Sequence, residues 1–409
     1  MAEILYYQLP TVTECTAAVV SCEEKDGRFL VALDRTMIFP EGGGQLPDGG
    51  SIEANGKTAA ILDCRTVGGE VIHYCDKPFV PGEKVRITLD LPRRLDHCEQ
   101  HTGEHMLSGL ASRLFSAKNV GFHMAETYCT IDLDIPLEPE QLEKLELAAN
   151  EAVRADRPVH TEVTDEADAM SRELRKRAEK AQGEVRIVYI DNGKIDSCTC
   201  CGTHLERTGM VGAIRITDAQ HYKGGTRLWF ACGRRAAEAA VAEHNSLTAL
   251  ARQYSTSREE LPKVVRKQMD ELASLKAELK QKSALLAGKT AAELLGKASA
   301  ERSGKTAVIA GILEGMNAND IRLVCDSLAA NGGAPWIALL FAPSAAGTDY
   351  RMACSAGGKL SMKELCSAVN AAVNGKGGGG PLFAQGKTER QVDAETLAML
   401  KSYIVKAAD

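Results

Sequence analysis

The sequence predicts a multidomain α+β protein with a small N-terminal β-barrel, an α+β metal-binding domain, a long helical linker and a C-terminal α/β domain. Three observations support this. The 409 residues exceed one ordinary domain. The first ninety residues read as short strands separated by Gly and Pro turns. The composition then becomes rich in Ala, Leu, Glu and Lys near residue 234. We expect domains at 1–91, 92–233, 234–300 and 301–409.

The barrel is predicted from apolar or alternating segments at 16–22, 28–33 and 59–63, the first two joined by an Asp26-Gly27 turn. A glycine-rich stretch at 41–50 follows the second segment. Its composition favours a turn between strands, but three consecutive glycines would also let backbone N–H groups approach a ligand. Gln45, directly after these glycines, would offer its amide to that ligand.

The next segment, 92–115, is predicted to be a helix carrying His101 and His105 on one face, because residues four apart lie one turn apart. His97 would share this face, nearer the helix start and solvent. Such a histidine pair occurs by chance on many helices. It becomes a stronger candidate for metal binding here because a second cluster, Cys200 to His204, exists in a chain with only 9 histidines.

The candidate zinc ligands are His101, His105, Cys200 and His204, with Cys198 and Cys201 as alternative sources of sulfur. If all four bind, the site is closed and structural. If one does not, a metal-bound water could serve as a nucleophile. The spacing leaves both possibilities open.

The rest of this domain is predicted to contain both strands and helices. We expect strands at 127–133, 160–164, 185–190, 211–216 and 223–232, and helices at 139–155 and 165–181. The second helix contains a charge run, 172–180, which is usually a solvated face and could instead face phosphates.

From 234 to about 297 the chain is predicted to form two helices, separated at Glu260-Leu-Pro262. The second is long and resembles a coiled coil. A spacer and an oligomer interface explain this segment equally well.

The last hundred residues are predicted to form an α/β unit, with buried strands at 306–311 and 336–341 and helices at 320–330, 362–374 and 393–405. The glycine-rich segment 375–386 is interpreted as a loop whose N–H groups cradle phosphate beside Lys376 and Lys387. A flexible linker is the alternative. The P-loop pattern is absent, so the sequence does not support a nucleotide triphosphatase.

Composition excludes several classes of protein. A net charge of -6 and a pI near 5.9 argue against a wholly basic nucleic-acid binder, although local basic patches remain possible. No apolar run is long enough to span a bilayer, and the first residues do not resemble a secretory signal. Thirteen cysteines, an odd number, are better explained by a reducing cytoplasm than by a disulfide framework.

Several motifs, taken together in order, resemble alanyl-tRNA editing proteins of the long AlaX type and the editing domain of alanyl-tRNA synthetase. The segments 36–50, 94–108 and 120–133 resemble the glycine-rich motif, the first metal motif and the strands after it. The sequence CCGTH at 200–204, then TGMVG, resembles the second metal motif, and 223–233 the closing strand. The segment 377–386 resembles the C-Ala, or DHH-associated, domain.

The resemblance implies a zinc-dependent aminoacyl-tRNA deacylase that removes serine, and as a further candidate glycine, from mischarged tRNA(Ala). The four residues named above match the metal positions, with the departure that Cys201 stands where the synthetase motif has glycine. Thr36 matches a threonine linked with telling serine from alanine. The predicted catalytic residues are Thr36, Gln45 and Gln100, and the predicted substrate-binding residues are Gly42, Gly43, Gly44, Gly377, Gly378, Gly379 and Gly380.

Expected partners are tRNA(Ala) and a second copy of the chain, bound through the linker or the C-terminal domain; no membrane partner is expected. Two other classes of function stay open. One is a non-catalytic tRNA-binding protein with a structural zinc, and the other is a metallohydrolase of small esters.

Overall fold

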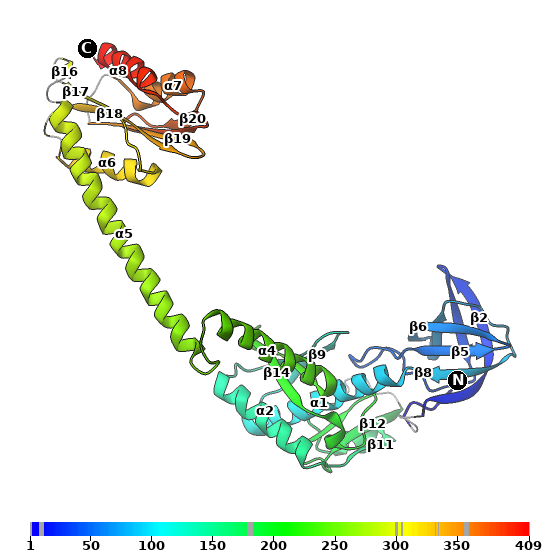
Figure 1. The fold of residues 1–409 in the computed structure, drawn as a ribbon. Helices are drawn as coiled ribbons and strands as arrows, with labels where there is room; N and C mark the ends of the chain where they lie inside the picture. Colours follow the sequence, from blue (N-terminus) through cyan, green and yellow to red (C-terminus); the bar gives the residue numbers. More distant parts are fainter. Residues whose placement is uncertain are drawn as a thin grey trace. The chain divides into compact units, whose positions relative to one another are not determined.

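The computed structural model describes residues 2–7, 12–177, 183–298, 302–303, 306–331, 333, 335–355 and 360–408. The chain divides into two compact units, Met1–Leu250 and Ala251–Asp409, each with its own core. The fold class expected from the sequence is confirmed, with a closed N-terminal barrel, mixed helices and sheets, and a C-terminal sheet domain (Figure 1). In the described part of the chain, no helix combines the length and apolar character needed to span a bilayer.

The barrel closes in the strand order β2-β3-β7-β6-β5-β8. Alternating side chains point inward, and Val31, Ile52 and Ile87 are fully buried. A parallel pair, β1 (Glu3–Ile4) and β4 (Arg35–Thr36), lies beside it. The barrel strands are β2 (Glu14–Lys25), β3 (Arg28–Leu33), β5 (Gly50–Ala54), β6 (Lys57–Val67), β7 (Glu70–Cys75) and β8 (Lys84–Leu89).

Helix α1 (Leu91–Phe115) follows the barrel and carries the first histidine motif. Asp90 caps it by accepting a hydrogen bond from the backbone N–H of Arg93 at 3.1 Å. Arg94 is fully buried, pairs with Asp48 and donates to the carbonyl of Met37 at 2.7 Å. This buried pair fixes the start of α1 against the barrel.

Two small sheets surround α1. One has the order β14-β15-β10-β9 and the other β11-β12-β13. Met106 and Leu107 of α1 pack in a common core with Ile131, Leu145 and Phe230. The strands are β9 (Asn119–Met124), β10 (Cys129–Leu133), β11 (Val159–Asp165), β12 (Glu184–Ile190), β13 (Asp196–Thr199), β14 (Ile214–Tyr222) and β15 (Gly225–Cys232); the helices are α2 (Pro139–Arg154), α3 (Glu166–Ser171) and the 3-10 helix η1 (Thr208–Val211).

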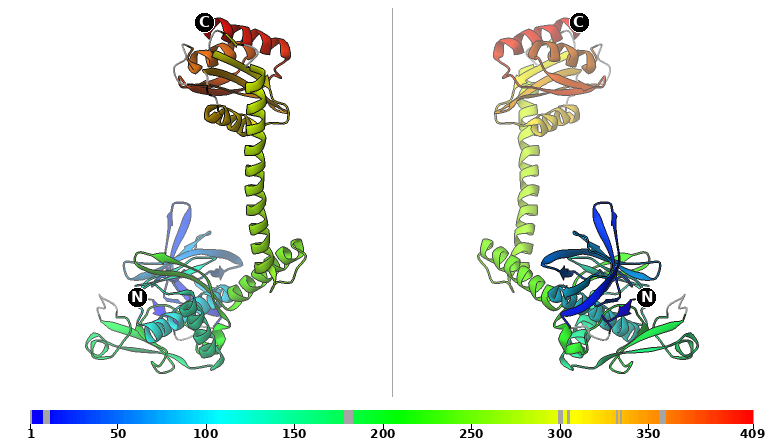
Figure 2. Two further views of the ribbon diagram at one scale, coloured as in Figure 1. Left: turned by 90° about the vertical axis from the view of Figure 1, so that its left-hand side faces the viewer. Right: turned by 90° about the vertical axis from the view of Figure 1, so that its right-hand side faces the viewer.

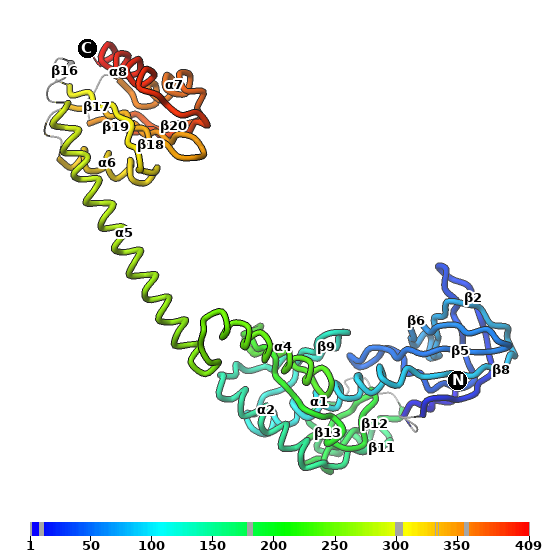
Figure 3. Tube along the Cα trace, viewed as in Figure 1, coloured from blue at the N-terminus to red at the C-terminus, as the bar shows by residue number. Residues whose placement is uncertain are grey.

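Helices α4 (Gly233–Gln253) and α5 (Leu261–Ala298) confirm the two predicted linker helices, and the tube shows α5 as one unbroken helix (Figure 3). In the second unit α6 and the end of α5 pack on one face of a six-stranded sheet, and α7 and α8 on the other (Figure 2). The order is β16-β17-β18-β19-β21-β20. Its elements are β16 (Arg302–Ser303), β17 (Thr306–Ile312), β18 (Trp336–Ser344), β19 (Gly347–Cys354), β20 (Lys376–Gly379), β21 (Phe383–Thr388), α6 (Ala318–Asn331), α7 (Met362–Val373) and α8 (Ala394–Ala408).

The helix predicted for 165–181 is wrong beyond Ser171, where α3 ends. Residues 172–177 run beside β13 instead: Arg175 donates its backbone N–H to Ser197, and Lys176 accepts from Thr199. Tertiary pairing overrides helix propensity here, because Arg172 is held by Glu162 and Arg175 by Asp196. The predicted end of this helix, 178–181, lies outside the described residues.

Two further strand and loop predictions need correction. The strand expected at 211–216 begins only at Ile214, because η1 occupies 208–211. The glycine-rich segment 375–386 is a β-hairpin rather than a loop, with Gly378 paired to Gln385. A Cβ on Gly375 or Gly386 would lie 2.4 Å from the Tyr350 side chain, so packing explains these two glycines.

Candidate metal centre

Four side chains from two segments meet close to Phe122 of β9, whose ring stacks on that of His101. His101 and His105 come from α1, and Cys200 and His204 from the loop after β13. Their ligand atoms all lie within 4.8 Å of one another. The Cys200 Sγ is 3.5 Å from Nε2 of His101 and 3.4 Å from Nε2 of His204. The structure therefore brings together all four predicted ligands as one candidate metal-binding cluster.

Each histidine in the cluster directs its other ring nitrogen to an oxygen acceptor. Nδ1 of His101 lies 2.8 Å from Oε1 of Gln45. Nδ1 of His105 lies 2.9 Å from Oδ2 of Asp196. Nδ1 of His204 lies 3.3 Å from the hydroxyl of Thr102. Such acceptors favour the tautomer that carries its proton on Nδ1, which leaves Nε2 as the nitrogen that could bind a metal.

The surrounding charges favour a thiolate at Cys200. Burial acts to raise the pKa of this thiol, but His101 and His105 beside it outweigh burial and hold the pKa well below its usual range. Burial lowers the pKa of His204 to about 3, and His105 adds to the effect, so this ring is neutral near pH 7. A thiolate and neutral imidazoles are the forms in which these groups bind a metal.

The structure distinguishes Cys200 from Cys198 and Cys201, the two other candidates for the sulfur ligand. Cys198 lies on the other side of His105, 3.5 Å from its Nδ1, and near the guanidinium of Arg175 at 3.7 Å. With His105 and Asp196 it forms a second potential ligand group. Arg175 already pairs with the carboxylate of Asp196 at 2.5 Å, so a cation occupies that position. Cys201 is exposed, and its carbonyl accepts a hydrogen bond from Tyr7.

The sequence interpretation of Gln45 as an amide presented to an approaching ligand is wrong. The side chain is fully buried, and its Nε2 donates to the hydroxyl of Thr203 at 2.8 Å. Its Oε1 accepts from the backbone N–H of Thr203 at 3.0 Å as well as from His101. Gln45 thus joins the barrel loop to both metal motifs and orients one of the histidines.

The glycines before it make a tight turn. Gly42 and Gln45 exchange backbone hydrogen bonds, and Gly43 and Gly44 between them have φ of 62° and 83°. Positive φ at both central residues is the type I′ arrangement, which favours glycine. A Cβ on Gly44 would lie 2.8 Å from the ring of Phe122. The turn interpretation is confirmed, and its tip, at Gly43, lines the cavity described below.

The structure places three other residues singled out in the sequence, Thr36, Gln100 and His97, outside the metal cluster. Thr36 is buried in the barrel, where its hydroxyl lies 2.8 Å from Nε2 of His73 and accepts from the N–H of Ile38. Gln100 is buried and exchanges two hydrogen bonds with the backbone of Cys232. Neither is among the residues that line the cavity described below, and their catalytic roles stay predictions. His97 is 1% exposed and therefore does not face solvent as expected.

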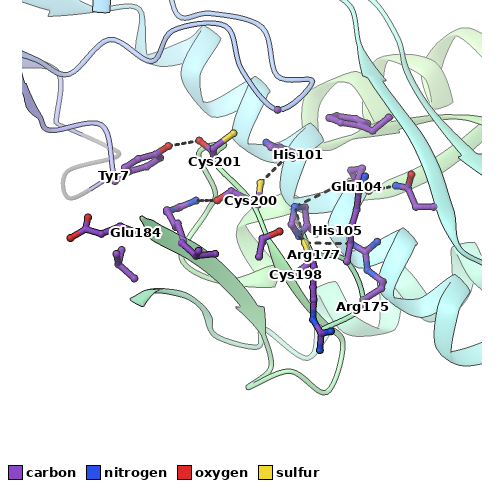
Figure 4. Close-up of a pocket in the computed structure, with 18 of the residues that line it drawn as sticks. Tyr7, His101, Glu104, His105, Arg175, Arg177, Glu184, Cys198, Cys200 and Cys201 are labelled. Atoms are coloured by element: carbon purple, nitrogen blue, oxygen red, sulfur yellow. Dashed lines mark hydrogen bonds and ion pairs between the residues drawn. The ribbon is translucent and has the colours of Figure 1, made fainter. Parts of the chain in front are cut away.

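A cavity of about 650 Å³ opens beside the cluster and is lined by His101, His105 and Cys200 (Figure 4). Glu104, which the sequence reasoning missed, also lines it and is 4% exposed. Its Oε1 accepts from Ser108 and Asn119, each at 2.6 Å. Its Oε2 lies 3.7 Å from Nε2 of His105 and faces the cluster. The carboxylate is therefore fixed by one oxygen, with the other directed at the candidate metal position.

Basic side chains line the same cavity. Arg186 donates to the carbonyls of Cys200 at 2.9 Å and Gly202 at 2.8 Å, and its guanidinium lies 4.3 Å from the centre of the Tyr7 ring. It thereby holds the shape of the loop that carries Cys200. Lys176 and Arg177 line the opening and are exposed. The charged side chains that line the cavity are therefore mostly basic, with Glu104 and Glu184 as the acidic ones, and this balance suits an anionic ligand.

Family models match two parts of the chain. Residues 185–228 match the threonyl and alanyl tRNA synthetase second additional domain, and residues 304–406 match the DHHA1 domain. The first match contains Cys200 and His204, and the second covers every strand of the second unit's sheet except β16. The segment that carries Cys200 and His204 is therefore similar to a domain found in threonyl and alanyl tRNA synthetases.

Curated relatives refine this class. The chain is 34% identical over 243 residues to the alanyl-tRNA editing protein AlaX-L of Pyrococcus horikoshii, with 58% of this chain and 59% of that protein covered. It is 32% identical over 235 residues to the alanyl-tRNA editing protein Aarsd1 of Bos taurus, with 55% and 52% covered. The chain thus spans little more than half the length of these relatives. The predicted resemblance to alanyl-tRNA editing proteins is confirmed.

A third relative matches across both units. The alanine–tRNA ligase of Halorubrum lacusprofundi is 30% identical over 395 residues, which is 94% of this chain and 42% of the ligase. Among solved structures, the C-Ala domain of Aquifex aeolicus alanyl-tRNA synthetase matches 26% of this chain and 96% of that domain at 17% identity. Its TM-score of 0.24 is too low to support an argument.

Proposed function

We propose that the chain is a trans-editing hydrolase that deacylates Ser-tRNA(Ala), with Gly-tRNA(Ala) as a further candidate substrate and zinc as its metal. The observation that carries the proposal is the buried cluster of three imidazoles and one thiol, each imidazole oriented by its own oxygen acceptor, beside a cavity whose charged side chains are mostly basic. The similarity to alanyl-tRNA editing proteins of Pyrococcus horikoshii and Bos taurus supports the choice of substrate. Such a reaction belongs in the cytoplasm, where tRNA is charged.

Zinc fits the donor geometry. Tetrahedral zinc with Zn–S of about 2.3 Å and Zn–N of about 2.05 Å requires sulfur and nitrogen ligands to lie about 3.6 Å apart. In the structure, Sγ of Cys200 lies 3.5 Å from Nε2 of His101 and 3.4 Å from Nε2 of His204. One thiolate and three imidazoles are also ligands that zinc accepts readily. When bound, the ion would fix the Cys200–His204 loop and place a positive charge at the inner end of the cavity.

The chain's own residues supply the remaining chemistry. The substrate is an aminoacyl ester, which is labile, so positioning and one proton transfer are sufficient. Glu104 is the candidate general base: Ser108 and Asn119 hold its Oε1, and its Oε2 is left to accept a proton from an attacking water. Arg175 and Asp196 hold His105, and Gln45 holds His101, so these three are positioning residues.

The two units would share the recognition of tRNA. In the first, Lys176 and Arg177 lie at the cavity opening, where the phosphates of the tRNA end would pass. In the second, Lys376 and Lys387 are directly opposite each other on β20 and β21 and are exposed. Gly377, Gly378 and Gly379 are exposed on the same edge strand, and Gly380 after them is half-buried, so phosphates could approach the backbone there.

A second candidate function is favoured by one observation. Four protein donors fill a tetrahedral shell and leave no position for water, which is the arrangement of a structural zinc site. In that case the chain would bind and deliver tRNA without hydrolysing it. The carboxylate of Glu104, fixed and directed at the cluster, is what favours hydrolysis over this alternative.

The test is deacylation of Ser-tRNA(Ala), Gly-tRNA(Ala) and Ala-tRNA(Ala) by the zinc-loaded chain, with and without a chelator. We expect fast, selective loss of serine that chelation abolishes. Retained tRNA binding without any hydrolysis would support the delivery function instead. Hydrolysis of small amino-acid esters at the same rate as of the tRNA substrate would contradict both.

A further inference from the structure

Arg186 carries more hydrogen-bond donors than the described part of the chain uses. Its half-buried side chain lines the cavity beside the candidate metal cluster. Nη1 donates to the carbonyls of Cys200 at 2.9 Å and Gly202 at 2.8 Å. Nη2 has no hydrogen-bond partner among the described residues, and Nε beside it is buried and has none either. A buried donor without an acceptor is destabilising, so a ligand that accepts from this side chain would bind favourably.

The guanidinium of Arg186 also lacks a carboxylate partner. Arg175, which lines the same cavity and is half-buried too, pairs with Asp196. Arg186 forms no ion pair within the described ranges of the chain. Glu184, two residues before it on β12, is exposed, and its carboxylate points away from the cluster (Figure 4). A half-buried guanidinium without a counter-ion is a favourable position for an anion.

Tyr7 fixes the orientation of this guanidinium. The centre of its ring lies 4.3 Å from Cζ of Arg186, which is the distance of a cation–π contact. The Tyr7 hydroxyl donates to the carbonyl of Cys201 (Figure 4), and the ring packs edge-on against the buried Tyr6. Because Nη1 is bonded and one face is stacked, the edge formed by Nε–H and Nη2–H is held in place. Two such parallel donors can bind two oxygens of one phosphate.

We propose that Arg186 binds the phosphodiester that precedes the terminal nucleoside of the aminoacyl-tRNA, with Tyr7 as its positioning residue. The proposal rests on the proposed function, which supplies the tRNA end as the ligand. The carboxyl group of the amino acid is esterified in this substrate, so the nearest negative charge is the 5′-phosphate, one ribose away from the ester. Arg186 is bonded to the backbone of Cys200, whose thiol belongs to the cluster. A phosphate on Arg186 would therefore leave the ester within reach of the cluster.

The first experiment compares two minimal substrates, 3′-O-seryl adenosine and the same ester with a 5′-phosphate. The wild-type kcat/KM should be about tenfold higher for the phosphorylated ester, as expected for a charge-assisted hydrogen bond. Arg186→Gln should remove this preference. Arg215→Gln, which removes the same charge from an arginine outside the cavity, is the matched control and should keep it.

Arg186 also holds the loop that carries Cys200, and the two substrates separate that role from phosphate binding. A purely structural role would lower both rates by the same factor and leave the preference for the phosphorylated ester unchanged. That result would overturn the proposal.

The second experiment tests the positioning role of Tyr7. Tyr7→Leu should reduce the preference for the phosphorylated ester, and it should have no further effect on that preference in the Arg186→Gln background. Tyr7→Phe keeps the stacked ring and loses only the hydroxyl, so it should retain most of the preference. A preference that is unchanged in Tyr7→Leu would contradict this role.

A binding measurement separates failure of this proposal from failure of the proposed function. In calorimetric titrations, adenosine 5′-monophosphate should bind wild type about tenfold more tightly than adenosine does, and the two should bind Arg186→Gln equally. If neither ester is hydrolysed but this difference is present, the phosphate site is supported and the hydrolase function fails. If both esters are hydrolysed at equal rates and the difference is absent, the hydrolase function stands and the phosphate site is overturned. Inorganic phosphate that binds as tightly as adenosine 5′-monophosphate would also overturn the assignment to the tRNA end.

Discussion

At the scale of single residues, the geometry of the site depends on the oxygen acceptors that orient the candidate ligands as well as on the ligands themselves. The histidine spacing and the cysteine–histidine cluster predicted the four donors from sequence. Gln45, Asp196 and Thr102, which orient the three rings, come from separate segments, and no spacing rule connects them. Two of them stand close to the motifs: Thr102 follows His101, and Asp196 lies four residues before Cys200.

Gln45 gives the first prediction. Gln45→Met keeps the volume of the side chain but removes the acceptor that holds the proton of His101 on Nδ1. Metal affinity should fall about 10–100-fold, which is typical for loss of such an orienting group. The measurement is competition with a chelator of known affinity. Gln100→Met is the control, since Gln100 is equally buried but bonds only to α1 and Cys232. Equal affinity in the two variants would contradict the orienting role.

Glu104 gives the second prediction. Glu104→Gln preserves the hydrogen bonds at Oε1 in shape but removes the proton acceptor. We expect the kcat for Ser-tRNA(Ala) to fall about 10²–10⁴-fold, the usual contribution of a general base. Zinc content and KM should change little. Ser108→Ala, which removes one holding contact, should cost far less. An unchanged kcat in Glu104→Gln would assign proton transfer to another group.

His73 gives a pH dependence. Burial lowers the pKa of His73 to about 4, from 6.5 in an exposed imidazole. The unfolded chain therefore takes up the proton first as the pH falls. The stabilising contribution of the neutral ring is complete above pH 6.5, declines as the pH falls to about 4, and is constant below that. The total loss is about 3 kcal/mol.

Hydrogen exchange at amides of β3 and β7 across this pH range would measure the effect. In His73→Leu the decline in stability between pH 6.5 and 4 should be smaller by the same amount.

The resemblance assigns serine selectivity to Thr36, the partner of His73. Because its hydroxyl is buried, we expect Thr36→Val to lower barrel stability by about 1–3 kcal/mol. A changed serine-to-alanine ratio in the folded variant would support the direct role.

At the scale of elements, periodic segments were predicted well and irregular ones were not. The barrel strands, α1 and the two linker helices each carry a regular apolar pattern, and all are present. The segment after α3 was misassigned because its pattern of Arg, Glu and Lys is helical, while its actual place beside β13 depends on Asp196. Local sequence cannot show that a buried carboxylate elsewhere requires an arginine.

The β20–β21 hairpin was misassigned for a related reason, because glycine-rich sequence also suits a loop. Gly386→Ala would place a methyl group 2.4 Å from the Tyr350 ring. We expect a loss of about 1–3 kcal/mol in the stability of the second unit, as for other overpacked cores. Gly378→Ala, with open space around its Cβ, is the matched control and should stay within about 0.5 kcal/mol of wild type. The unfolding transition of the second unit, followed by calorimetry, would measure both, and similar losses would contradict the packing explanation.

At the scale of the whole molecule, the proposed function requires an acidic chain to bind a polyanion. The net charge of -6 does not prevent this, because binding depends on local potential and screened contacts. The basic residues predicted as a phosphate patch are only partly available. Arg172 is paired with Glu162 and Asp168, and Arg175 with Asp196. Lys176 and Arg177 remain at the cavity, and Lys376 and Lys387 in the second unit.

Because available basic residues lie in both units, a prediction follows about how the two units share tRNA binding and chemistry. If Lys376 and Lys387 contact tRNA phosphates while chemistry occurs in the first unit, the double variant Lys376→Gln, Lys387→Gln should raise KM and leave kcat unchanged. The slope of log affinity against log salt should fall by about 2, one for each lost contact. Lys263→Gln with Lys267→Gln, two exposed lysines on α5, is a control of equal charge. An equal effect of both pairs would mean that only net charge matters, whereas a fall in kcat with unchanged KM would show that the hairpin acts on the chemical step.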